Sequence, residues 1–147
     1  MSKQIVLFLC SGNSCRSQMA EAFLRHEAGD RFEAASAGLE PKPIHPLTLQ
    51  VLQEAGISTK GLHSKGLEEF LGHVATNYVI FVCDKAHQAC PRIYPFALQS
   101  LYWPFEDPAA FQGTPEEQLA RFRAVRDQIH DQINRWRAAG DQSNSER

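Results

Sequence analysis

An apolar run followed by a short polar turn constrains this chain more than any other feature. Residues 3–10 read KQIVLFLC, and no polar side chain interrupts the run after its first two positions. Because apolar and polar residues do not alternate, the run predicts a strand buried on both faces, as in a parallel sheet. The following segment, residues 11–16, is small and polar. Residues 17–28 then have the spacing of a helix with one apolar face.

The rest of the chain continues this alternation of strands and helices. Further strands are expected at residues 32–38, 78–83 and 100–105, and further helices at residues 46–55, 67–72 and 115–139. Thr114 and Glu117 have the spacing of a capping box at the start of the last helix. The alternation predicts an α/β fold with a four-stranded parallel sheet flanked by helices on both faces.

Length and charge narrow the class of protein. A chain of 147 residues favours one domain, which we place at residues 1–139, with residues 140–147 as a flexible C-terminal tail. No apolar run approaches the ~18 residues of a membrane span, and no cleavage site follows the first apolar run. A net charge of -2 offers no electrostatic support for binding nucleic acid. We therefore expect a cytoplasmic protein without a membrane or nucleic-acid partner.

The turn between the first strand and the first helix has the composition of an anion site. Small residues allow backbone N–H groups to surround a tetrahedral oxyanion, and the helix N-terminus adds positive potential. Arg16 can clamp two oxygens, while the same field favours the thiolate of Cys10, to which Ser17 can donate. The oxyanion-binding candidates are Ser11, Gly12, Asn13, Ser14, Cys15, Arg16 and Ser17. For Cys15 we favour a structural role over a chemical one.

A carboxylic acid beyond the last predicted strand could assist a nucleophilic attack. Asp107 precedes Pro108, and a loop carboxyl at this place could protonate the group that leaves. The alternative is that Asp107 only initiates a turn, the common use of Asp-Pro. Glu106 is the competing carboxylate.

Two further cysteines lie close together in the sequence. Cys83 ends a predicted strand, and Cys90 follows it after six residues. A nucleophilic attack needs one thiol, whereas a reduction needs two electrons, which a dithiol supplies when it becomes a disulfide. A metal site of Cys83, His87 and Cys90 is an alternative without an evident fourth ligand. Inert packing is the other alternative.

The segment LFLCSGNSCRSQMAEAF resembles the active-site loop of the low-molecular-weight protein tyrosine phosphatase superfamily and, more narrowly, of the thioredoxin-coupled arsenate reductases. The resemblance runs from about Lys3 to Trp136 and includes the segments SAG, VCDKAHQACP, WPFEDPA and FRAVRDQI. It implies the same fold that the alternation of elements predicts.

The resemblance also implies an activity. Arsenate would be converted to arsenite through a covalent intermediate on Cys10, with Asp107 as the acid and Cys10, Cys83 and Cys90 as a disulfide relay that thioredoxin reduces. It implies no cofactor and no catalytic metal, and phosphate and sulfate would mimic the substrate. The rivals are a protein tyrosine phosphatase and a non-catalytic oxyanion or arsenic sensor. A glutaredoxin or glutathione system is an alternative reductant.

Several arsenate reductases of this family hold a potassium ion behind the anion loop. The corresponding residues here resemble Asn13, Glu21, Ser36 and Lys65, so a lysine replaces an acidic ligand. We expect the Lys65 ammonium to take the place of the ion, pairing with Glu21 and donating to Asn13 and Ser36. The alternative is that Lys65 points into water.

Overall fold

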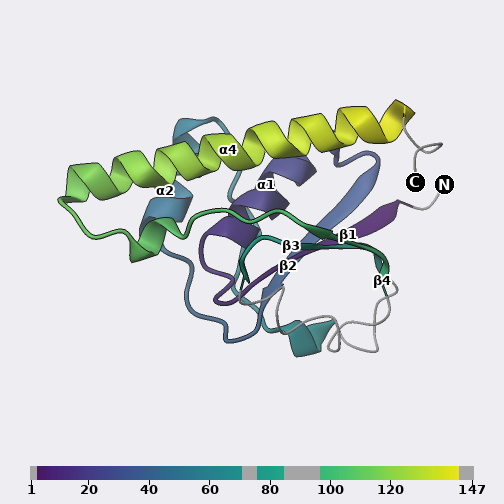
Figure 1. Ribbon diagram of the computed structural model, residues 1–147, viewed down its shortest axis with the longest axis horizontal. Coiled ribbons are helices and arrows are strands. Elements are labelled where there is room, and N and C mark those ends of the chain that lie inside the picture. Colours follow the sequence, from purple (N-terminus) through teal and green to yellow (C-terminus); the bar gives the residue numbers. More distant parts are fainter. Residues whose placement is uncertain (1–2, 71–75, 85–96, 143–147) are drawn as a thin grey trace.

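The computed structural model describes residues 3–70, 76–84 and 97–142. Its strands are β1 (Gln4–Cys10), β2 (Phe32–Gly38), β3 (Thr76–Phe81) and β4 (Ala97–Tyr102). They form one parallel sheet in the order β2-β1-β3-β4 (Figure 1). The predicted α/β fold with a four-stranded parallel sheet is thereby confirmed.

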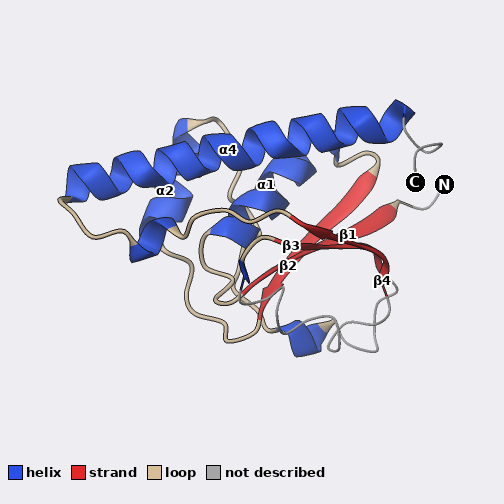
Figure 2. Cartoon of the chain, viewed as in Figure 1, coloured by secondary structure: helices blue, strands red, loops and turns tan. Residues whose placement is uncertain are grey.

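The helices are distributed unevenly about this sheet. In the described ranges they are α1 (Arg16–Ala28), α2 (Pro46–Glu54) and α4 (Pro115–Gln142), with the short 3-10 turns η1 (Leu67–Glu69) and η2 (Pro108–Ala110). Figure 2 shows the three α-helices together on one side of the sheet, and α1 contacts both α2 and α4. Within the described ranges, the opposite side carries η1, a 3-10 turn at the start of the helix expected over residues 67–72, of which residues 71–72 lie outside the described part.

The centre of the sheet determines where a ligand can bind. β1 pairs with β2 on one side and with β3 on the other, so the direction of the strand order reverses at β1. In open parallel sheets, ligands bind beyond the carboxyl end of the strand at such a point. Cys10 is the last residue of β1, and Val6 to Cys10 are at most 2% exposed, as expected for a strand buried on both faces.

The two later strands begin and end earlier than the sequence suggested. β4 ends at Tyr102, three residues before the expected end, and the Trp103 N–H still donates to the Phe81 carbonyl over 2.8 Å. Pro104 follows and has no N–H to continue the ladder. β3 ends at Phe81, so Cys83 lies two residues beyond the strand.

Two helices differ from their expected forms in instructive ways. α1 is buried on almost every side from Ser17 to Leu24, although the sequence suggested a single apolar face. It lies between the sheet and α4, which leaves little of its surface to solvent.

The predicted capping box of α4 is present, with Thr114 and Glu117 exchanging hydrogen bonds of 2.9 and 3.1 Å. α4 continues to Gln142, past the expected end at Ala139.

α2 has a cap that the sequence did not suggest. The helix begins at Pro46 as predicted, and the His45 side chain accepts a hydrogen bond from the Leu47 N–H. The chain leaves the helix through Gly56, whose φ of +77° suits glycine.

In the described part of the chain, no helix has the length and apolar character needed to cross a membrane.

Candidate active site

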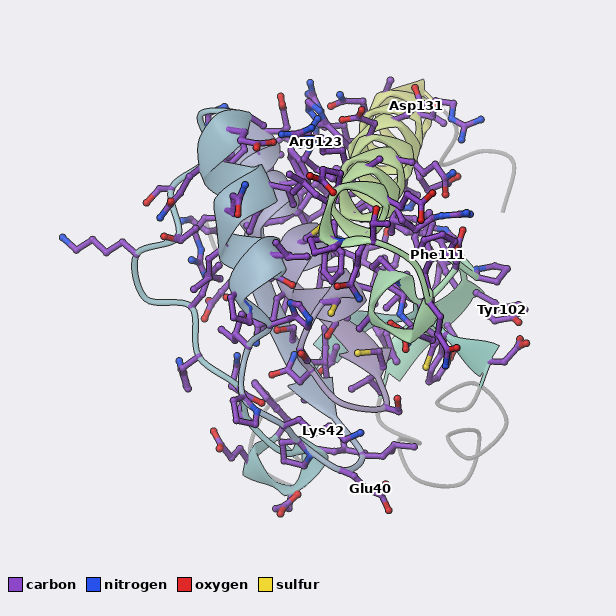
Figure 3. The ribbon with its side chains drawn as sticks, turned by 90° about the vertical axis from the view of Figure 1, so that its left-hand side faces the viewer. Glu40, Lys42, Tyr102, Phe111, Arg123 and Asp131 are labelled. Carbon is purple, nitrogen blue, oxygen red and sulfur yellow. The ribbon has the colours of Figure 1, made fainter. Side chains whose placement is uncertain are left out.

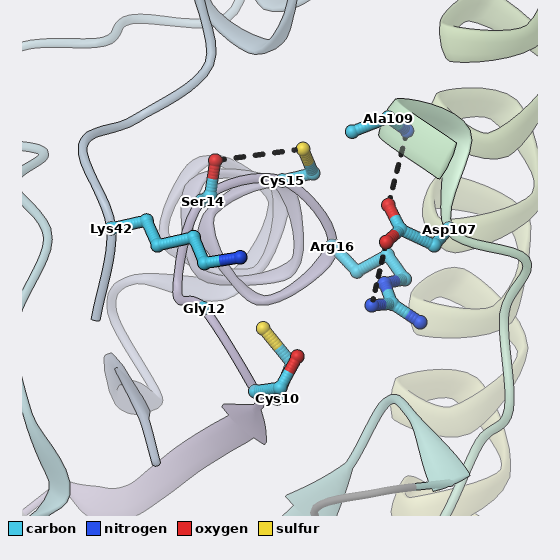
Figure 4. A pocket seen from close by; sticks show the side chains of 9 residues that line it. Cys10, Gly12, Ser14, Cys15, Arg16, Lys42, Asp107 and Ala109 are labelled. Carbon is cyan, nitrogen blue, oxygen red and sulfur yellow. Dashed lines mark hydrogen bonds and ion pairs between the residues drawn. The ribbon is translucent and has the colours of Figure 1, made fainter. Parts of the chain in front are cut away.

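The predicted anion loop surrounds a pocket at the carboxyl end of β1. The residues that line it are Cys10, Ser11, Gly12, Ser14, Cys15, Arg16, Lys42, Asp107 and Ala109. Figure 4 shows them converging from three places in the chain: the loop before α1, the segment after β2 and the turn η2. Asn13 and Ser17 are fully buried and hold the loop from behind.

The sulfur of Cys10 sits at the base of this pocket and is hydrogen-bonded. The Asn13 N–H donates to it over 3.3 Å, and the Ser17 hydroxyl lies 3.0 Å away. Asn13 Nδ2 in turn donates to Ser17 Oγ over 2.9 Å, which leaves the hydroxyl hydrogen of Ser17 free to point at the sulfur. The sulfur of Cys10 is thus within hydrogen-bond reach of a backbone N–H and of a hydroxyl that has its hydrogen to give.

Asn13 shapes the loop through both its backbone and its side chain. Its φ of 51° is left-handed, a conformation that Asn tolerates better than most residues. Its Nδ2 also donates to Ser36 Oγ over 2.9 Å. Its Oδ1 accepts from Gln18 Nε2 and from the Lys65 N–H, both over 2.9 Å. Gln18 also donates to the Asn13 and His63 carbonyls, and the sequence interpretation missed this residue.

The loop packs directly against the end of β2. A Cβ atom on Gly38 would lie 2.8 Å from both the Asn13 nitrogen and the Ser11 oxygen, closer than real Cβ contacts come. These are backbone atoms of the anion loop, so they cannot move aside without reshaping it. Glycine at this position is therefore a requirement of the close approach.

Arg16 and Asp107 meet at the pocket from distant parts of the sequence. Arg16 Nη1 donates to the Phe105 carbonyl over 3.1 Å, and Nη2 lies 3.6 Å from Asp107 Oδ2. The Arg16 side chain is 11% exposed, and its buried Nε has no partner among the described residues. Asp107 Oδ1 also accepts from the Ala109 N–H over 3.0 Å, so this carboxylate caps the η2 turn while facing the pocket.

The competing carboxylate is directed elsewhere. Glu106 forms an ion pair with Arg121 of α4 over 3.1 Å and does not line the pocket. Of the two adjacent acids, Asp107 is therefore the one placed to reach a bound anion.

Cys15 lies within the pocket wall but differs from Cys10 in its surroundings. It is 5% exposed, and its Sγ lies 3.7 Å from Ser14 Oγ. Burial raises the pKa of its thiol from 9.0 to about 11. Cys15 is therefore a neutral thiol at physiological pH, in agreement with the structural role favoured above.

Cys83 lies two residues beyond β3, the strand that pairs in parallel with β1, which ends at Cys10. Leu9 is opposite Phe81 in the parallel register, and the Val82 N–H donates to the Leu9 carbonyl over 2.9 Å. Val82 therefore lies opposite Cys10, and Cys83 is the next residue along the chain. Cys83 is 3% exposed. Cys90 and His87 lie outside the described residues. Among the residues that are described, no group of three His, Cys, Asp or Glu side chains could hold a metal ion.

Behind the loop, Lys65 is buried rather than solvated, so the alternative that it points into water is wrong. Its Nζ lies 3.6 Å from Glu21 Oε1 and donates to the His63 carbonyl over 2.8 Å. Glu21 also accepts from Ser36 Oγ over 2.6 Å and pairs with Arg25.

The expected contacts of the Lys65 ammonium need one correction. Asn13 receives the backbone N–H of Lys65, not its ammonium, and Ser36 donates to Glu21 instead of meeting Lys65. An ammonium 3.6 Å from Glu21 repels a second cation, so these residues do not fit a potassium ion.

The fold and the site together define a class. A Cys, five residues and an Arg between a central parallel strand and a helix, with an Asp beside the Arg, form the anion site of a cysteine-dependent phosphatase fold. The chain belongs to the low molecular weight phosphotyrosine protein phosphatase family, which matches residues 5–145.

Relatives within this family include reductases. The chain is 39% identical to an arsenate reductase of Bacillus licheniformis over 96% of this chain and 100% of the relative. A solved arsenate reductase in the phosphate binding state shares 31% identity and a TM-score of 0.76 over 92% of this chain and 97% of the other. A thioredoxin-dependent arsenate reductase of Corynebacterium glutamicum shares 30% identity and a TM-score of 0.60, over 90% of this chain and 62% of the other.

Proposed function

We propose that this protein is a cytoplasmic arsenate reductase that takes its electrons from thioredoxin. The observation that carries the proposal is the pocket itself. It presents the Cys10 sulfur beneath a ring of loop residues, with Arg16 and Asp107 at one side. Extended similarity to proteins named arsenate reductases supports the same activity.

The lining of the pocket favours a small inorganic oxyanion over a phosphorylated tyrosine. None of the described residues that line it is aromatic, so an aryl ester would have no ring to stack on. Trp103 is 9% exposed and packs against Phe8 and Trp136. Phe105 faces Arg16 with its carbonyl group. Residual phosphatase activity toward small esters is compatible with this pocket.

The first step uses the residues of the anion loop. The Cys10 thiolate attacks the arsenic of arsenate, and a sulfur–arsenic bond forms as an arsenic–oxygen bond breaks. Asp107 in its acid form protonates the departing hydroxide, which leaves as water. Arg16 binds two of the remaining oxygens. Arsenic is still pentavalent in this intermediate.

The reduction uses the other cysteines. Cys83 attacks the sulfur of Cys10, the electron pair of the sulfur–arsenic bond passes to arsenic, and arsenite leaves with a Cys10–Cys83 disulfide behind it. Cys90 then attacks Cys83, which forms a Cys83–Cys90 disulfide and frees Cys10. The two electrons are restored when an external dithiol reduces this disulfide. Thioredoxin is the proposed donor, with glutaredoxin or glutathione as the alternative.

The decisive experiment measures arsenite formed from arsenate in the presence of thioredoxin, thioredoxin reductase and NADPH. Steady turnover is expected, and binding of arsenate without turnover would instead indicate a sensor. Cys10→Ser should form no arsenite, Cys83→Ser should stop at the arsenic adduct of Cys10, and Cys90→Ser should stop at the Cys10–Cys83 disulfide.

Mass spectrometry of the trapped proteins tests this order, with Cys15→Ser as the matched control that should still turn over. Normal cycling of Cys90→Ser with thioredoxin would contradict the three-thiol relay.

A further inference from the structure

The segment after β2 brings a basic side chain to the pocket that the mechanism above does not use. Its backbone pairs with the anion loop: the Leu39, Glu40 and Lys42 N–H groups donate to the Cys10, Ser11 and Gly12 carbonyls over 3.2, 2.8 and 2.8 Å. Figure 3 shows Glu40 and Lys42 at the end of the molecule opposite α4. The position of Lys42 is therefore tied to the loop that holds the nucleophile.

The Lys42 side chain follows the loop toward the pocket. A Cβ atom built on Gly12 would lie 3.7 Å from Lys42 Cδ, so the aliphatic stem covers Gly12 at ordinary contact distance. Figure 4 shows the amine directed over the pocket, on the side facing Arg16 and above Cys10. In the described part of the chain this ammonium makes no ion pair or hydrogen bond, and the residue is exposed.

The charges at the pocket leave a role for a second cation. A doubly charged oxyanion beside the Cys10 thiolate faces Arg16 and a helix N-terminus worth about half a positive charge. Part of the Arg16 fork is already engaged, since Nη1 donates to the Phe105 carbonyl over 3.1 Å and Nη2 lies 3.6 Å from Asp107 Oδ2. Lys42 stands across the pocket from this pair and has no carboxylate of its own among the described residues.

We infer that Lys42 is a substrate-binding residue, which contacts an oxygen of the bound dianion that the Arg16 fork does not cover. A flexible stem with a compact ammonium suits this place, since it can follow the anion as it enters and leaves. The inference names the anion-binding group of the proposed reductase and rests on that function for its substrate. The binding of inorganic phosphate by the pocket tests it separately.

The experiment compares four proteins with their cysteines in the reduced thiol form: wild type, Lys42→Gln, Lys42→Arg and Lys60→Gln. Lys60 is an exposed lysine that does not line the pocket, so its variant controls for the loss of one positive charge. Titration calorimetry measures the Kd for inorganic phosphate, and thermal melting without phosphate checks the fold. Lys42→Gln should raise the Kd about tenfold, the low end for a hydrogen bond to a charged group. Lys42→Arg should retain most of the affinity, and Lys60→Gln should change it less than about twofold.

The arsenate assay adds a second readout. Lys42→Gln should raise the KM for arsenate by a similar factor while kcat changes little, because the contact is made before and during the reaction. An unchanged phosphate Kd in Lys42→Gln, or an equal loss in Lys60→Gln, would overturn the role of Lys42. Weaker phosphate binding by Lys42→Gln in a protein that never forms arsenite would instead overturn the proposed reductase and leave the anion contact standing.

Discussion

Two regions that face the same pocket are built in opposite ways. The anion loop, residues 10–17, is held by buried hydrogen bonds, and Asn13 and Ser17 are fully inaccessible. The acid turn, residues 105–109, lies at the surface, and the Asp107 side chain is 41% exposed. One ion pair to Arg16 and one turn hydrogen bond hold this carboxylate.

The difference fits the roles that we propose for the two regions. Donors that stabilise a thiolate and an oxyanion work best when they are already oriented, because no reorganisation is then needed during the reaction. An acid must exchange its proton with solvent in each cycle, so an exposed side chain with few partners serves better. Changes in the acid turn should therefore affect rate, and changes in the loop should affect both fold and anion affinity.

The largest expected effect is on the acid turn. Asp107→Asn should slow the first chemical step by about a hundred- to ten-thousand-fold, the usual contribution of a general acid. Rapid-quench measurement of the arsenic adduct gives this rate, and the phosphate Kd should remain nearly unchanged. Glu106→Gln is the matched control, since that carboxylate pairs with Arg121 and should leave the rate unaltered. An equal loss in both variants would remove the acid role from Asp107.

Substitutions at two glycines test how tightly the anion loop is held. Gly38→Ala places a Cβ atom 2.8 Å from backbone atoms of the loop, whereas Gly12→Ala meets nothing closer than 3.7 Å. We expect Gly38→Ala to lower the free energy of unfolding by about 1–3 kcal/mol and to weaken phosphate binding. Gly12→Ala should keep wild-type stability in the same urea titrations. Equal stability of the two variants would show that the loop can shift away from β2.

Cys15 predicts how the loop region responds to alkaline pH. Its folded pKa of about 11 exceeds its ordinary value of 9.0, so its contribution to stability is complete below pH 9 and is lost as pH rises toward 11. Between these limits the free energy of unfolding of wild type should fall by about 1–3 kcal/mol more than that of Cys15→Ala. Urea titrations from pH 7 to 10.5 measure the difference, and parallel curves would contradict it.

The smallest expected effect concerns the support behind the loop. Wild type should melt at the same temperature in potassium as in tetramethylammonium, because the Lys65 ammonium lies beside Glu21. Lys65→Asp removes this cation and adds a carboxylate, and we expect potassium to raise its melting temperature by about 2–4 °C. A potassium-specific rise in wild type would show that the ammonium does not substitute for an ion.

The structural features that the sequence predicted correctly are those that depend on local chemistry. The apolar run that became β1, the capping box at Thr114 and the Cys10-to-Arg16 loop are each contained in a few consecutive residues, and all three are present. The sequence prediction ended β4 too late in the chain. Pro104, which has no N–H to donate to a neighbouring strand, was a usable signal for the earlier end. The burial of α1 on almost every side had no local signal, since it depends on how α4 packs across that helix.

By itself, therefore, the sequence determined that Cys10 and Arg16 lie in one loop between a strand and a helix, because neighbouring residues share one backbone geometry. Only the tertiary structure decided which distant groups reach the pocket. It directed Asp107, which the resemblance had implied as the acid, toward the pocket and Glu106 away from it, placed Lys42 above Cys10 and directed Gln18 to Asn13. Each of these contacts depends on the packing of separate elements. Glu106 and Asp107 are adjacent and have the same chemistry, so they differ only in the direction in which the fold points them.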